Sequence, residues 1–174
     1  MKRLLMTTLG LAVFVGLALP LRAQHNTRGK AEVTLKGEKV SVDYGRPSLH
    51  GRTVKEMLAE LKPGQFWRLG ADQSTTFSTG IALAFGHVTV PAGTYSLWAE
   101  KGSNDTWKLV FNKQHGQWGT QHDPKLDFAS VPLREEKAAG SAEMVTINLA
   151  RMGHDAEFSV QWGDLKLVTN FRAK

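Results

Sequence analysis

The stretch EFSVQWGDLKLVTNF, residues 157–171, carries the pattern that decides the fold. Large apolar residues alternate with polar ones on both sides of Gly163-Asp164. The apolar positions are Phe158, Val160, Trp162, Leu165, Leu167 and Phe171. Alternation with period two places one face of a strand in the core and the other in solvent, and a Gly-Asp pair suits a two-residue hairpin turn. We predict antiparallel strands at 157–162 and 165–171 joined at Gly163-Asp164, in a sheet with one solvated face.

The same alternation recurs along the chain, separated by turns rich in glycine, proline, asparagine and aspartate. It predicts a hairpin whose strands carry Val33 and Leu35 on one side of the turn at 36–39 and Val40, Val42 and Tyr44 on the other. Further strands are predicted at 65–69, 74–79, 87–90, 94–99, 106–112, 126–131 and 144–150. We therefore predict a mainly β chain: a single antiparallel β-sandwich or jelly-roll-like barrel of about ten strands with one short helix.

The helix is predicted after Thr53, because Thr53 and Glu56 fit a capping box in which each side chain satisfies a free backbone N–H of the first turn. An apolar stripe at helical spacing follows and consists of Val54, Met57, Leu58 and Leu61. Pro63-Gly64 ends the pattern, so a helix of about nine residues is expected.

The N-terminus has the pattern of an export signal. Lys2 and Arg3 precede a mostly apolar run from Leu4 to Leu19, and a small residue, Ala23, offers a cleavage position. We predict a signal peptide over 1–23, a flexible tail over 24–30 and one domain over 31–174. The protein is then periplasmic or extracellular, with no membrane span after cleavage. Cleavage halves the net charge of +6 and leaves no run of five or more like charges, so no nucleic-acid partner is expected.

The sequence has few signals of catalysis. The 174 residues include no cysteine, which excludes a disulfide scaffold, a thiolate metal site and a cysteine nucleophile. No G-x-S-x-G, G-x-G-x-x-G or H-E-x-x-H motif occurs, and no two of the six histidines have the close spacing that aims them at one metal. His115, His122 and Asp123 are interpreted as a solvated loop. No catalytic residue, metal or cofactor is expected.

Polar side chains gather at glycine turns in the segments 44–48 and 66–77. Arginine offers a planar fork of donors that suits carboxylate or phosphate oxygens, and nearby polar side chains complete a pocket. The candidate ligand-binding residues here are Arg46, Arg68, Asp72, Gln73 and Thr75. The structural alternative is that Arg46 or Arg68 pairs with Asp72 or Asp43 and fastens a loop to the sheet.

Trp118 is the sixth candidate, because it lies between glycines in the predicted loop 112–120, whereas Trp67, Trp98, Trp107 and Trp162 fall in predicted strands and are assigned to the core. Trp118 either stacks on a ligand or folds back as an end plug of the sandwich; both possibilities stay open.

Several motifs together resemble an uncharacterised family of exported bacterial proteins, domain-of-unknown-function family 2911. The similarity covers roughly residues 33–171 and is carried by YGRP at 44–47, FWRLGA at 66–71, STTF at 74–77, PAGTYSL at 91–97, and FNK at 111–113 with QWG at 117–119. The family pattern usually has Asn-Glu where this chain has Asp72-Gln73, which disfavours acid–base catalysis by a carboxylate at position 73. The resemblance implies export and the fold, and it implies no activity.

The sequence is therefore consistent with three functions. The favoured one is non-catalytic binding of a small or glycan-like ligand of the bacterial envelope through the six candidate residues. A hydrolase of envelope glycans or esters is the first alternative, with Asp72 as acid or base and a partner among Asp43, His50 and Asp123. The second alternative is a purely structural or interaction module.

Overall fold

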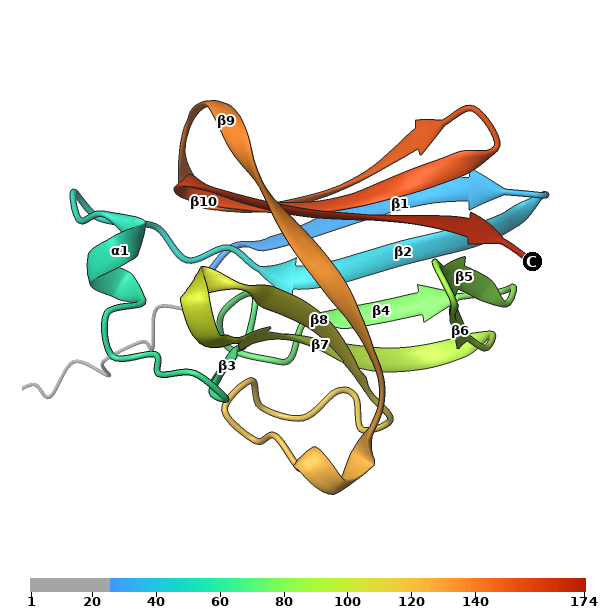
Figure 1. The fold of residues 1–174 in the computed structure, drawn as a ribbon, viewed down its shortest axis with the longest axis horizontal. Coiled ribbons are helices and arrows are strands. Elements are labelled where there is room, and N and C mark those ends of the chain that lie inside the picture. Colours follow the sequence, from blue (N-terminus) through green and yellow to red (C-terminus); the bar gives the residue numbers. More distant parts are fainter. Residues whose placement is uncertain (1–25) are drawn as a thin grey trace, which may run out of the picture.

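The structure is a computed structural model that describes residues 26–174 (Figure 1). The signal peptide expected at 1–23 lies outside the described residues. Ten strands, one short α-helix and two 3-10 turns make up the described chain. The elements are β1 (Arg28–Leu35), β2 (Glu38–Gly45), α1 (Val54–Met57), β3 (Phe66–Trp67), β4 (Thr76–Thr79), β5 (Leu83–Phe85), β6 (Val88–Val90), β7 (Gly93–Lys101), η1 (Ser103–Asp105), β8 (Trp107–Asn112), η2 (Pro124–Leu126), β9 (Asp127–Met152) and β10 (Asp155–Ala173).

All strands belong to one antiparallel sheet with the order β1-β2-β4-β7-β8-β9-β10-β5-β6, and β3 pairs with β7 beside this path. β9 joins the two halves of the sheet, because its residues 127–133 pair with β8 and its residues 134–152 pair with β10. Figure 1 shows β9 bending between these halves, and β1 contacts β9 and β10 without pairing with them. The sheet is not closed, so the expected antiparallel fold of about ten strands with one helix is confirmed in its open form.

The core lies between the two halves of this folded sheet. Phe77, Phe111, Phe158 and Phe171 are fully buried there, with edge-to-face contact between Phe77 and Phe111. Each of these four rings buries a large apolar surface and stabilises the fold by roughly 1.5–3 kcal/mol relative to exposure. The chain thus has an extensive apolar core without any disulfide.

The predicted hairpin at Gly163-Asp164 is wrong, although the alternation around it is correct. β10 runs through this pair without reversing, and both of its halves pair with β9: Phe158 lies opposite Leu149 and Leu165 lies opposite Lys137. Gly163 has a φ of +59° and marks a register shift in the ladder, so a bulge at this glycine bends the strand.

Three further boundaries differ from the prediction. The segments 126–131 and 144–150 are not separate strands, because the small residues 138–141 between them continue β9 instead of forming a loop. Residues 28–30, expected in a flexible tail, belong to β1 and pair with residues 43–45 of β2. Strand β5 was not predicted.

The capping box is confirmed, whereas the helix is shorter than predicted. The Thr53 side chain accepts from the Glu56 N–H, and the Glu56 carboxylate accepts from the Thr53 N–H at 2.6 Å. Only Val54–Met57 is α-helical; Leu58 and Leu61 follow in turns and still pack against the core.

Candidate functional site

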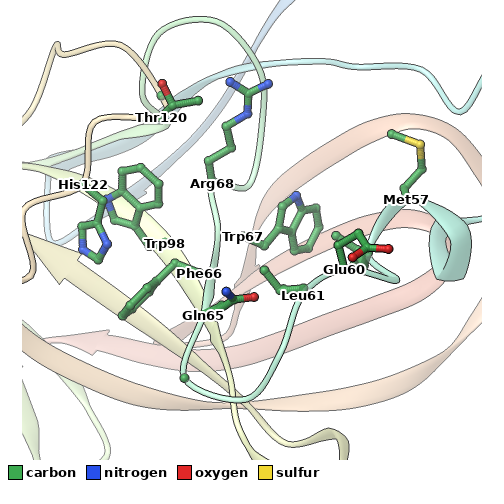
Figure 2. A pocket seen from close by; sticks show the side chains of 13 residues that line it. Met57, Glu60, Leu61, Gln65, Phe66, Trp67, Arg68, Trp98, Thr120 and His122 are labelled. Atoms are coloured by element: carbon green, nitrogen blue, oxygen red, sulfur yellow. The ribbon is translucent and has the colours of Figure 1, made fainter.

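A groove of about 700 Å³ lies where β3 meets β7 and the segment 119–122 (Figure 2). Its wall combines aromatic and aliphatic side chains with one cationic side chain, one acidic side chain and three other polar ones. The lining residues are Met57, Leu58, Glu60, Leu61, Gly64, Gln65, Phe66, Trp67, Arg68, Trp98, Gly119, Thr120 and His122. The volume falls in the range typical of small-molecule sites.

Strand alternation explains which side chains reach the groove. Trp67 and Leu69 are buried in the core, so their neighbours Phe66 and Arg68 project from the opposite face. On the paired strand β7, Leu97 and Ala99 face the core, and Trp98 therefore lies on the same outer face as Phe66. Figure 2 shows Trp67 reaching the groove from the other side of β3, next to Leu61.

The outer aromatic residues enclose His122. Its ring stacks on the Trp98 indole, with 4.4 Å between centroids and an angle of 22°, and it meets Phe66 edge-on at 4.3 Å. Its Nε2 lies 2.9 Å from the Asp127 carboxylate. The imidazole is therefore held on two sides by rings and at one nitrogen by a carboxylate.

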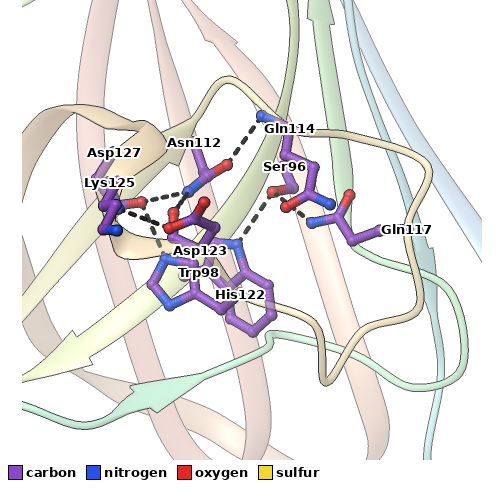
Figure 3. Close-up of polar contacts among 9 residues, drawn as sticks. All are labelled: Ser96, Trp98, Asn112, Gln114, Gln117, His122, Asp123, Lys125 and Asp127. Carbon is purple, nitrogen blue, oxygen red and sulfur yellow. Dashed lines mark hydrogen bonds and ion pairs between the residues drawn. The ribbon is translucent and has the colours of Figure 1, made fainter.

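Asp127 is itself held in place by a network of hydrogen bonds (Figure 3). Asn112 donates from its amide to Asp127 Oδ1 at 2.7 Å and to the Asp123 carbonyl at 2.8 Å, while its own oxygen accepts from the Gln114 N–H. On the other side of Trp98, its indole N–H donates to the Ser96 hydroxyl at 3.0 Å. The bonds of Asn112 join β8 to β9 and to the segment 113–126, and the bond of Trp98 fixes its indole within β7.

The Asp127 contact decides the chemistry of the two imidazole nitrogens. An ionised carboxylate only accepts, so Nε2 of neutral His122 carries the proton and Nδ1 carries the lone pair. Nδ1 has no hydrogen-bond partner among residues 26–174. The fully buried polar side-chain atoms without a partner in this range are Gln117 Oε1 and Trp162 Nε1, so Nδ1 is not among them. Because His122 lines the groove, Nδ1 is an accessible acceptor in its wall.

Arg68 supplies the cationic group of the groove. Its guanidinium has neither a hydrogen bond nor an ion pair within the described part of the chain. The side chain passes close to Gly119, where a Cβ atom would stand 3.3 Å from Arg68 Cδ. Figure 2 shows Glu60 on the far side of Trp67 from Arg68, so the two charges lie at different ends of the groove.

The loop that carries Arg68 is held in a conformation that side chains rarely adopt. Leu69 and Asp72 have φ values of 55° and 60°, in the left-handed region that costs roughly 1–2 kcal/mol for a residue with a Cβ. Backbone bonds to the segment 117–119 offset this strain: Gly119 N–H donates to the Asp72 carbonyl at 2.7 Å, and Ser74 N–H donates to the Gln117 carbonyl at 2.9 Å.

Among the six predicted ligand-binding residues, Arg68 is the one that lines the groove. Arg46 points toward β9, where its guanidinium donates to the Val145 carbonyl at 3.2 Å and to Thr146 Oγ1 at 3.3 Å. Thr75 is 1% exposed and donates to the Arg68 carbonyl at 3.1 Å, so it supports the loop from inside. Arg46 and Arg68 form no ion pair with a carboxylate of the described residues, which argues against the structural alternative for these two side chains.

The other three candidates lie beside the groove. Gln73 is exposed and forms an isolated β-bridge with Trp118. Trp118 is 45% exposed and directly precedes Gly119 and Thr120 in the groove wall, so it does not serve as a buried end plug. The Asp72 carboxylate accepts from the backbone N–H of Asn26 at 2.8 Å.

The three predicted segments do meet, although mainly through their backbones. Gly45 packs on Ala71, Asp72 bonds to Gly119, and Ser74 bonds to Gln117. The segments 44–48, 66–76 and 112–120 are therefore neighbours. Their side chains do not converge on one cleft, because Arg46 faces β9 and Thr75 faces inward.

The acid–base partners considered for Asp72 have their contacts elsewhere. Asp43 binds Arg28, with its Oδ1 2.6 Å from the arginine Nε. Asp123 caps η2 by accepting from the Lys125 N–H. His50 is exposed and its backbone N–H donates to Glu143.

The sequence analysis missed His122, Trp98 and Phe66 as parts of the site. His122 was assigned to a solvated loop, and Trp98 to the core. The alternation of Trp98 with Leu97 and Ala99 was the signal that places it on the outer face. No local signal identified His122, because its environment comes from β3, β7 and β9.

Residues 26–174 contain no group of three histidine, aspartate or glutamate side chains arranged to hold a metal ion. Within the same range no helix has the length and hydropathy needed to cross a membrane.

The fold and the groove define an open antiparallel β-sheet protein with an aromatic-walled site on the outer face of the sheet. The chain belongs to the family described as Protein of unknown function (DUF2911), whose sequence profile matches residues 26–171. This match confirms the resemblance drawn from the motifs. Searches of curated proteins and of solved structures found no match.

Proposed function

We propose that this protein binds, without catalysing a reaction, a small or glycan-like anionic ligand in the groove around Arg68. The observation that carries the proposal is the Arg68 guanidinium, which has no partner within residues 26–174, in the wall of a groove of about 700 Å³. The planar arginine fork can donate two parallel hydrogen bonds to a carboxylate or phosphate.

The surrounding residues support a ligand with a ring or an apolar face. Phe66 and Trp67 offer aromatic surface, and Leu61 extends it. Aromatic side chains bury large areas at little entropic cost, because they have only two rotatable bonds. The anion then supplies orientation at Arg68, while the body of the ligand supplies contact area.

Two observations favour binding over hydrolysis. Glu60 is the one carboxylate among the described lining residues, whereas hydrolysis of a glycosidic bond generally needs two acidic groups across the scissile bond. Asp72, the acid or base of the hydrolase hypothesis, does not line the groove, and Asp43 and Asp123 are engaged elsewhere. The groove and its free guanidinium also favour binding over a purely structural role.

The ligand belongs, in this proposal, to the bacterial envelope or its surroundings. The signal peptide expected at 1–23 would deliver the protein to the periplasm or the medium, where glycans and acidic small molecules are accessible.

The test compares cyclohexanecarboxylate with its uncharged amide, cyclohexanecarboxamide, in NMR titrations of the protein. Binding of the carboxylate at least tenfold tighter than the amide is expected, with the loss of this preference in Arg68→Gln. The matched control is Arg172→Gln, which removes the same charge from an exposed residue of β10 outside the groove. No carboxylate binding, or equal loss in both variants, would overturn the proposal.

A further inference from the structure

A second hollow lies beside the groove, and Phe66 lines both of them. This hollow has a volume of about 340 Å³ and is lined by Phe66, Glu100, Val110, Asp127, Phe128, Ala129 and Ser130. Phe66 lines both cavities, and the His122–Asp127 pair spans them, with His122 in the first and Asp127 in the second. The two hollows are therefore neighbours on the outer face of the sheet, and together they are called the track.

The polar groups of this track include both donors and acceptors. Arg68 contributes only donors, and its guanidinium is unpartnered within residues 26–174. His122, with its Nδ1 acceptor, lines the same groove as Arg68, and the second hollow contains the carboxylates of Glu100 and Asp127, of which Glu100 lies 3.8 Å from Lys108 Nζ. Asp127 Oδ1 already accepts two bonds, from His122 and Asn112, whereas His122 Nδ1 has no partner within residues 26–174.

We infer that the ligand is an acidic oligosaccharide of at least two sugar rings, whose carboxylate binds Arg68 and whose hydroxyl group, further along the chain, donates to His122 Nδ1. This inference rests on the proposed function and names the substrate class of the same site. A sugar hydroxyl can donate to the free imidazole nitrogen, and sugar rings present apolar faces to Phe66 and Trp67. The ring of His122 is fixed by Trp98, Phe66 and Asp127, so the acceptor is ordered before the ligand arrives.

An acidic peptide is the competing class, since its N–H groups also donate. Extended peptides are usually captured by pairing with a free strand edge, and β3, the strand in the groove, has only two residues. The short edge disfavours this mode, and the arrangement of a cation, aromatic rings and a single free imidazole acceptor favours the glycan.

The chain-length dependence of binding tests the inference with the unmodified protein. The probes are galacturonate, trigalacturonate and cyclohexanecarboxylate, measured by NMR titration or calorimetry, with tri-glutamate as the peptide probe. Trigalacturonate is expected to bind about tenfold tighter than galacturonate, and tri-glutamate more weakly than trigalacturonate. Equal binding of monomer and trimer, or preference for tri-glutamate, overturns the inference.

Two variants then test whether His122 Nδ1 contributes to the tighter binding of trigalacturonate. His122→Phe keeps a ring between Trp98 and Phe66 but removes the acceptor, so it is expected to weaken trigalacturonate binding roughly threefold to tenfold, the range of one net hydrogen bond. His115→Phe is the matched control, because His115 is an exposed histidine of the same loop outside the groove. If His122→Phe binds trigalacturonate as tightly as the unmodified protein does, Nδ1 does not accept a hydrogen bond from the ligand.

The same probes separate this inference from the proposed function. If cyclohexanecarboxylate binds in an Arg68-dependent way while chain length has no effect, the anion site stands and the oligosaccharide is wrong. If none of the acids binds, both fail. Should His122→Phe fold poorly by circular dichroism, the chain-length series in the unmodified protein still decides the inference.

Discussion

Gly45, the last residue of β2, lies directly against the backbone of Ala71. A Cβ atom at position 45 would stand 2.1 Å from the Ala71 carbonyl oxygen, a separation that no real structure tolerates. This contact ties the end of β2 to the strained loop that carries Arg68.

Replacement of Gly45 by alanine should therefore destabilise the protein by about 1–3 kcal/mol, the usual cost of inserting an atom into a packed site. Urea unfolding measures the loss. Gly140→Ala is the matched control, since no atom lies within 4 Å of a Cβ at that position. Equal stability of the two variants would contradict the close packing at Gly45.

Thr75→Val should destabilise the protein by about 1–3 kcal/mol, because it removes the hydroxyl that donates to the Arg68 carbonyl from a site that is 1% exposed. Thermal unfolding monitored by circular dichroism measures the effect. Thr75→Ser, which keeps the hydroxyl, should retain most of the stability. A valine variant as stable as the unmodified protein would contradict the role of the Thr75 hydroxyl.

Glu143 should contribute to the pH dependence of stability on the acid side. Hydrogen bonds from the Ser48 hydroxyl and the His50 N–H hold the pKa of the Glu143 carboxyl below its usual 4.5. A carboxyl with a lowered pKa in the folded state stabilises the fold above its unfolded pKa, and this contribution is lost as pH falls through the folded pKa. Melting temperatures of the protein and Glu143→Gln, measured from about pH 6 to about pH 3, should converge on acidification. Parallel curves would show that Glu143 is not linked to folding.

Trp118 should dominate the quenching of tryptophan fluorescence by iodide. It is 45% exposed, whereas the other four tryptophans are 3–6% exposed, so a charged quencher reaches mainly this indole. Trp118→Phe is expected to remove most of the quenchable emission and to change the melting temperature little. Quenching that persists in this variant would mean that another indole is accessible.

The export hypothesis predicts a mature protein that begins at Gln24. The protein expressed from its full sequence in a bacterial host should appear in the periplasmic or culture fraction, and intact-mass spectrometry should find the chain shortened after Ala23. Cleavage within a few residues of this bond also supports export. A full-length chain retained in the cytoplasm would contradict it.

Several local features of the fold were predictable from the sequence. Phe158, Val160 and Trp162 are buried as their alternation indicates, and Thr53 and Glu56 form the expected capping box. These features depend on neighbours within a few residues, so a local pattern contains the required information. The hairpin at Gly163-Asp164 failed because a turn and a strand bulge place the same residues around a glycine.

The candidate site was predictable only in part. The motif at 66–71 indicated Arg68, because an arginine beside glycine turns is suited to anions. Arg46 has the same local signal, yet its guanidinium donates to β9, a hundred residues away in the chain. His122 lacked any signal, since its environment consists of Phe66, Trp98 and Asp127, which lie on three different strands.

By itself, the sequence determined the alternation of buried and exposed side chains, the helix cap and the family. The tertiary structure alone decided the strand pairing, the continuity of β9 and β10, and the residues that share the groove. The physical reason is the range of the interactions. Alternation and capping act over two to four residues, whereas sheet register and the support of a groove are set by contacts between strands far apart in the chain.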